Sequence, residues 1–252
     1  MDDTAATLAW ALHDQGQYAN AVLWARRALA LRISPERFAQ LGWLHLCLGK
    51  PNEAIPLFNQ SLIDDPTNTV SHLHLARSYS EVGQRKTAER VLTKGLEHAP
   101  NEPTLLLALA WLHHERGDQA HALTLATQVT EIQNSNASAW HLLGVSHLNS
   151  GNNEQAVRYL EHAFSVDPKH ADIAYQLAYS YYRSNRPEDA KNTISIARLQ
   201  HPRHYALGKL SVQIALDEHH WEVARQITHQ LMGHQSEDGD LCGSAWETSR
   251  HH

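Results

Sequence analysis

The sequence repeats with a period close to 34 residues, and this periodicity limits the folds open to the chain. The period is marked by five glycines with spacings of 33, 34, 34 and 34 residues: Gly16, Gly49, Gly83, Gly117 and Gly151. The same spacing continues to Asn185, a residue that tolerates left-handed backbone, and to His219, a weaker match. A period of this length predicts a tandem array of small structural units that bury their apolar faces against one another.

Four further positions of the period predict a helical hairpin. An alanine stands five residues after each of the seven turn positions: Ala21, Ala54, Ala88, Ala122, Ala156, Ala190 and Ala224. Eight residues before the turn six periods have leucine, and the next residue is small or short. Prolines close four periods, at Pro66, Pro100, Pro168 and Pro202. The order is helix, turn, helix and stop, with small residues where the two helices approach closely.

A 34-residue hairpin with these small residues, a glycine turn and a closing proline resembles the tetratricopeptide repeat (TPR). The resemblance implies an all-α fold, a right-handed α-solenoid of helix-turn-helix hairpins over residues 2–238. Its seven units are expected at 2–34, 35–68, 69–102, 103–136, 137–170, 171–204 and 205–238. Residues 239–252 are expected to be a disordered or expression-derived tail.

Some positions depart from the pattern. Pro56 falls inside a predicted second helix, where a local kink is expected. Gly208 and Ser211 replace bulkier residues in the last unit, which is therefore expected to be either a capping repeat or a frayed one.

Composition argues against several classes of partner and location. The net charge of −6 gives no electrostatic reason to bind nucleic acid. The sequence has no continuous apolar run of the roughly 18 to 20 residues that cross a bilayer, and it opens with acidic residues rather than a basic leader. Cys47 and Cys242 are too few for a disulfide framework. We therefore expect a cytoplasmic protein without membrane insertion.

Twenty histidines suggest a metal or acid-base site, but their spacing within helices does not support one. Adjacent His113 and His114, for example, point to different faces of a helix. Motifs for zinc proteases, nucleotide binding and esterases are absent. His45, His113 and His147 share one position before the turn, which favours a packing role. We expect no catalytic residues, no cofactor and no metal site.

The resemblance to TPR proteins implies that the first helices of the hairpins line a concave groove that binds the partner. The residues predicted to contact a partner are Trp10, Trp43, Arg77, Trp111, His114, His141, Tyr175, Tyr179 and Tyr182. Aromatic side chains bury large areas at little entropic cost, which makes them favourable anchors. The alternative is that the rings only pack against neighbouring helices.

The sequence thus predicts a non-catalytic scaffold, an adaptor, assembly factor or chaperone, that binds a protein or peptide. One alternative is the TPR portion of a larger enzyme, such as a glycosyl- or sulfotransferase. Another is a groove that binds a saccharide. The partner and pathway stay open, as does a homo-oligomer formed through the terminal repeats.

Overall fold

The computed structural model describes residues 4–235, and these form fourteen α-helices with no strand among them. The helices are α1 (Thr4–Asp14), α2 (Tyr18–Leu31), α3 (Pro35–Cys47), α4 (Pro51–Asp64), α5 (Thr69–Glu81), α6 (Arg85–His98), α7 (Pro103–Glu115), α8 (Gln119–Ile132), α9 (Ala137–Asn149), α10 (Asn153–Val166), α11 (Ala171–Arg183), α12 (Pro187–Gln200), α13 (Tyr205–Asp217) and α14 (Trp221–Gln235). The all-α prediction is confirmed. The predicted tail at 239–252 lies outside the described residues, as do both ends of the predicted array.

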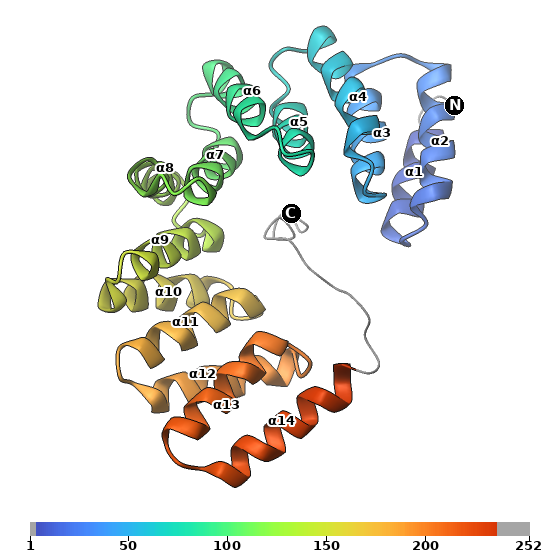
Figure 1. The fold of residues 1–252 in the computed structure, drawn as a ribbon. Coiled ribbons are helices and arrows are strands. Elements are labelled where there is room, and N and C mark those ends of the chain that lie inside the picture. Colours follow the sequence, from blue (N-terminus) through green and yellow to red (C-terminus); the bar gives the residue numbers. More distant parts are fainter. Residues whose placement is uncertain (1–3, 236–252) are drawn as a thin grey trace. The chain divides into compact units, whose positions relative to one another are not determined.

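The chain divides into two compact units between His121 and Ala122, within α8. In the first unit α3 contacts α5, and α5 contacts α7. In the second unit α9 contacts α11, and α11 contacts α13. Consecutive helices pair as hairpins in both units (Figure 1). Within a unit, therefore, the first helix of a hairpin lies against the first helix of the next.

The seven predicted turn positions all adopt left-handed backbone, including the two that are not glycine. Asn185 has a φ of 58° and His219 a φ of 61°, close to the 78° of Gly83. At Gly83 the turn is closed by two hydrogen bonds, from the Gly83 amide to the Ser80 carbonyl and from the Gln84 amide to the Tyr79 carbonyl. This is the Schellman pattern of helix ends, which requires a positive φ at the turn residue. The prediction of the turns is confirmed.

Close helix approach explains the small residues of the repeat. Ala122 and Ala156 are fully buried. A Cβ atom at Gly144 would lie 2.4 Å from Cγ of Leu160 on the facing helix, and one at Gly42 would lie 2.9 Å from the Phe58 ring. The glycines therefore make room for the large side chains of the second helix.

The departures from the pattern do not interrupt the helices that contain them. Pro56 lies inside α4, which continues to Asp64. Gly208 faces Leu231, whose side chain fills the space that a larger residue at 208 would need, so α13 and α14 form a hairpin. The repeated leucine is not buried in every unit: Leu8 in the first hairpin is 38% exposed.

None of the fourteen described helices combines the length and the apolarity needed to cross a bilayer.

Candidate partner-binding site

The nine predicted contact residues all lie on first helices, and they divide between the two units. Five belong to the first unit: Trp10 on α1, Trp43 on α3, Arg77 on α5, and Trp111 and His114 on α7. Four belong to the second unit: His141 on α9, and Tyr175, Tyr179 and Tyr182 on α11. The candidate site therefore consists of separate surfaces in the two units.

In the first unit a connected run of side chains crosses α1, α3 and α5, and we call it the aromatic ladder: Trp10, His13, Trp43, His74 and Arg77. The ring centroids of Trp10 and His13 are 5.5 Å apart, and those of Trp43 and His74 are 4.6 Å apart. Between them the Trp43 indole donates a 3.1 Å hydrogen bond to Nε2 of His13. Three successive first helices are thus joined by ring contacts and one hydrogen bond.

The aromatic ladder is both a packing element and an accessible surface. Trp10 is 44% exposed, whereas Trp43 is half-buried between His13 and His74. The guanidinium of Arg77 lies 5.8 Å from the centre of the Trp43 ring, and its Nε donates a 2.9 Å hydrogen bond to Glu81. Cation–π contact and ion pair together hold Arg77 over the ring.

His74 is neutral at pH 7 and acts as an aromatic residue. Burial, and to a lesser degree the nearby Arg77, lower the pKa of His74 to about 4. Within the described part of the chain its buried Nδ1 has no hydrogen-bond partner. His74 is not among the predicted contact residues, because its partners Trp43 and Phe58 belong to the preceding hairpin. His13 is not among the predicted contact residues either, although its place three residues before the turn matches that of His114.

Trp111 and His114 form a second pair in the first unit, on α7. Their rings meet edge to face with centroids 5.6 Å apart. Nδ1 of His114 lies 3.2 Å from the side-chain oxygen of Gln119, and burial lowers the pKa of His114. The pair therefore presents one indole and one neutral imidazole.

In the second unit α11 carries a tyrosine surface made of Tyr175, Tyr179, Tyr182 and Arg183. The rings of Tyr175 and Tyr179 stack with centroids 6.2 Å apart. Arg183 donates a 3.1 Å hydrogen bond to the Tyr179 hydroxyl, and Tyr182 donates a 2.6 Å bond to Asp217 on α13. This bond to Asp217 raises the pKa of Tyr182. Arg183 was not predicted, although its place one turn after Tyr179 is a usable signal.

His141 lies on α9, apart from the tyrosines in sequence. Its ring centroid is 6.1 Å from that of His170, which caps the start of α11 by accepting a hydrogen bond from the Ile173 amide. His141 is among the predicted contact residues, but its pairing with His170 is not indicated by the sequence pattern.

Among the described residues one group has the composition of a metal site: His113, Asp118 and His121. The spacing of histidines within single helices does not indicate this group, because it forms across the turn between α7 and α8.

Comparison with protein families gives matches along most of the chain. Three models described as "Tetratricopeptide repeat" match it, the first at residues 48–112 and 147–214. The second matches residues 3–34 and the third residues 103–128.

Two curated relatives are longer repeat proteins. Tetratricopeptide repeat protein 8 of Caenorhabditis elegans is 24% identical over 170 residues, which cover 66% of this chain and 34% of that protein. TPR repeat-containing protein YpiA of Bacillus subtilis is 21% identical over 194 residues, covering 77% of this chain and 46% of that protein. The chain thus spans between a third and a half of the length of these relatives.

Solved structures with the same fold include PilF of Pseudomonas aeruginosa, with a TM-score of 0.70, 17% identity, and coverage of 81% of this chain and 97% of that one. They also include Cut9 from the APC/C hetero-tetramer Cut9–Hcn1, with a TM-score of 0.75 and 17% identity. The match covers 91% of this chain and 46% of that one. At such identities the likeness concerns the fold. Because one repeat model alone matches more than half of the sequence and the helices pair as the repeat requires, the chain belongs to the tetratricopeptide repeat family.

Proposed function

We propose that this chain is a non-catalytic scaffold that binds a segment of a partner polypeptide on the first helices of its hairpins. The observation that carries the proposal is the aromatic ladder. It joins α1, α3 and α5 through side chains and leaves Trp10 44% exposed. A large aromatic side chain that is accessible and held in place by its neighbours is a favourable binding anchor.

The chemistry of the aromatic ladder indicates what a bound segment would offer. The exposed Trp10 ring favours aliphatic or aromatic side chains. Glu81 accepts from Nε of Arg77, and among the described residues no further hydrogen bond of Arg77 is found, so its terminal amino groups can donate to a ligand. We therefore propose an extended segment with apolar side chains and one carbonyl or carboxylate at the Arg77 end.

The structural neighbour Cut9–Hcn1 is a complex of two different proteins. Under this proposal the present chain likewise works through association with another polypeptide. The tyrosine surface of the second unit would supply further contacts, because Arg183 and Asp217 hold two of its hydroxyl groups in place.

The experiment that tests the proposal is a peptide-library selection on the immobilised chain, followed by affinity measurement for the selected peptides. The test variant is Trp10→Ala combined with Arg77→Gln. The matched control is Trp221→Ala on α14, which removes an equally large ring that is 62% exposed. We expect the test variant to lose affinity by at least about tenfold, since central aromatic and arginine anchors typically contribute 2 kcal/mol or more.

Circular dichroism should show that both variants are folded. The proposal is contradicted if selected peptides bind the folded test variant and the intact chain equally well, or if the selection yields no specific peptide.

A further inference from the structure

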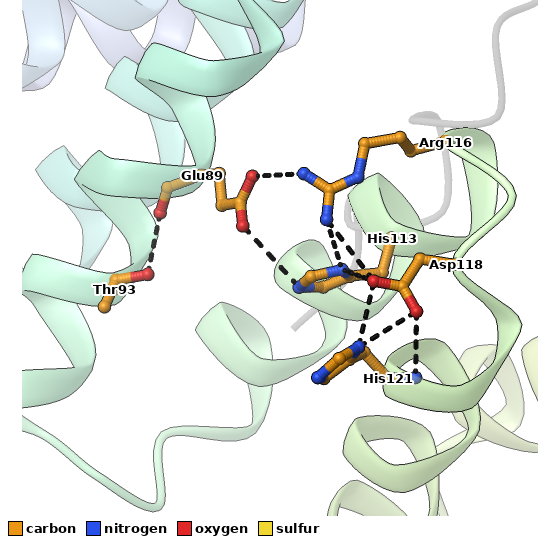
Figure 2. A network of polar contacts seen from close by, with 6 residues as sticks. All are labelled: Glu89, Thr93, His113, Arg116, Asp118 and His121. Carbon is orange, nitrogen blue, oxygen red and sulfur yellow. Dashed lines mark hydrogen bonds and ion pairs between the residues drawn. The ribbon is translucent and has the colours of Figure 1, made fainter.

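The turn between α7 and α8 brings together three side chains that commonly bind metals. His113 lies in the last turn of α7, Asp118 follows the Gly117 turn, and His121 lies in the first turn of α8 (Figure 2). One ligand atom from each lies within 4.8 Å of the other two. All three residues fall within nine consecutive positions, so the turn itself fixes their arrangement.

The distances between the donor atoms resemble those of a coordination shell. Nδ1 of His121 is 2.9 Å from both carboxylate oxygens of Asp118, and Nδ1 of His113 is 3.2 Å from Oδ2 of Asp118. Ligands at zinc distances of 2.0–2.1 Å are separated by about 3.3 Å in a tetrahedral site. The two separations that involve Asp118 therefore differ from this spacing by about 0.4 Å or less, and the two histidine donor atoms lie within 4.8 Å of each other.

We propose that His113, Asp118 and His121 form a binding site for a divalent transition-metal cation of the zinc type. The ligands are Nδ1 of both histidines and one carboxylate oxygen, and water fills the fourth position. Two imidazoles and one carboxylate suit zinc and its neighbours better than the hard cations magnesium and calcium. The hydrogen bond with His121 lowers the pKa of Asp118 to about 2, so its carboxylate is ionised at neutral pH.

In the structure the guanidinium of Arg116 provides the positive charge beside the proposed ligand atoms of His113 and Asp118. One of its amino groups lies 3.3 Å from Nδ1 of His113 and 3.3 Å from Oδ2 of Asp118, and the other donates a 2.7 Å bond to Glu89 (Figure 2). A metal ion would displace the first contact, while Arg116 would keep Glu89. The guanidinium thus competes with the metal for the same lone pairs.

The tautomers of His113 and His121 allow a metal ion to replace Arg116 at the ligand atoms. Nδ1 of His113 can accept from Arg116, which leaves its proton on Nε2, 4.0 Å from Glu89. A carboxylate behind the ring of a ligating histidine orients it and increases its basicity. At His121 the Nδ1 proton that now faces Asp118 would move to Nε2 of the exposed ring.

The corresponding positions of other hairpins indicate that this set is not a general feature of the repeat. In the second hairpin they hold His45, Lys50 and Glu53, and in the fifth His147, Asn152 and Gln155. The backbone turn is shared, but the fourth hairpin alone has three metal-binding side chains at these places. The proposed site therefore belongs to this hairpin.

The test is calorimetric titration of the full chain with Zn²⁺, using a background in which His251 and His252 are alanine so that the terminal imidazoles do not contribute. We expect one equivalent to bind with an affinity that falls at least about 10 to 100-fold in His121→Asn and in Asp118→Asn. Asp118→Asn keeps an acceptor for the His121 amide, so α8 keeps its cap. His220→Asn removes another exposed histidine and is the matched control.

A second variant separates metal binding from structural effects. Arg116→Gln removes the competing cation, and we expect it to bind Zn²⁺ several-fold more tightly than the intact chain. Tetrahedral Co²⁺ absorption bands should appear in the intact chain and be absent in His121→Asn. The proposal is overturned if the folded His121→Asn and Asp118→Asn variants bind Zn²⁺ as the intact chain does, or if the intact chain binds none.

Discussion

The hydroxyl groups of Ser61 on α4 and Ser71 on α5 lie 2.8 Å apart in the core of the first unit, and both residues are fully buried. Ser61 also donates a 2.8 Å hydrogen bond to the carbonyl of Pro35 at the start of α3. A hydroxyl has one proton, so Ser71 must be the donor to Ser61. Ser61 thus links three helices, whereas Ser71 only completes the chain of bonds.

This assignment of donors and acceptors predicts that two otherwise similar substitutions lower the free energy of unfolding by different amounts. Ser61→Ala leaves both the Ser71 hydroxyl and the Pro35 carbonyl without their partner, and we expect it to lower the free energy of unfolding by about 1–3 kcal/mol. Ser71→Ala leaves the Ser61–Pro35 bond intact and should cost about 1 kcal/mol or less. Urea denaturation of both variants measures the difference, and a larger loss for Ser71→Ala would contradict the assignment of donors.

Gly144→Ala tests the close approach of α9 and α10. The new Cβ would lie 2.4 Å from Cγ of Leu160, so the Leu160 side chain or the helix that carries it has to shift. We expect a loss of about 1–3 kcal/mol in the free energy of unfolding. Leu160→Ala in the same chain removes the clash, so the double variant should lose clearly less than the sum of the single losses. Additive losses would show that the two residues do not meet.

The two turns without glycine predict stabilising substitutions. His219 has a φ of 61°, which costs a residue with a Cβ atom about 1 kcal/mol. We expect His219→Gly to raise the melting temperature, because glycine adopts this conformation without strain. Asn185→Gly should raise it less, since asparagine already tolerates positive φ. A melting temperature lowered by His219→Gly would mean that the ring contact with Trp221, at 5.6 Å, outweighs the strain.

His74 predicts a loss of stability in mild acid. Burial lowers its pKa to about 4 in the folded chain, so between pH 6.5 and 4 the unfolded chain binds the proton more readily. The free energy of unfolding should therefore fall as the pH drops below 6.5, with a contribution from His74 of about 2 kcal/mol at pH 5.

The measurement is the difference in unfolding free energy between pH 7 and pH 5, for the intact chain and for His74→Phe. Phenylalanine keeps a ring between Trp43 and Phe58 but does not titrate. The variant should lose less stability than the intact chain over this interval. It should still lose some, because burial also lowers the pKa values of His45 and His72. Equal losses in both proteins would show that His74 is protonated without penalty.

The fold was largely predictable because its determinants are local and repeat. Each turn needs a residue that tolerates positive φ, and each helix pair needs small residues where it closes. Gly83 and Ala122 satisfy these two requirements at fixed spacing. Leu8 shows the limit of the pattern, since the same residue type is exposed where no described hairpin covers it.

The candidate site was less predictable because its contacts connect different hairpins or cross a turn. The spacing of Trp43 and Arg77 placed them on one face, but the contact of Trp43 with His74 depends on how α3 packs against α5. His113 and His121 meet only because the Gly117 turn reverses the chain between them. A search restricted to single helices cannot find such pairs.

The left-handed turn that the hairpins share has a consequence for engineering. In the second hairpin buried His45 already stands where His113 stands in the fourth, and its Nδ1 lies 2.9 Å from Glu53, the counterpart of His121. Replacing Lys50→Asp and Glu53→His would copy the order of histidine, aspartate and histidine onto this second turn. Metal-binding residues could then be introduced into individual hairpins, because each hairpin has the same backbone turn and only side chains need to change.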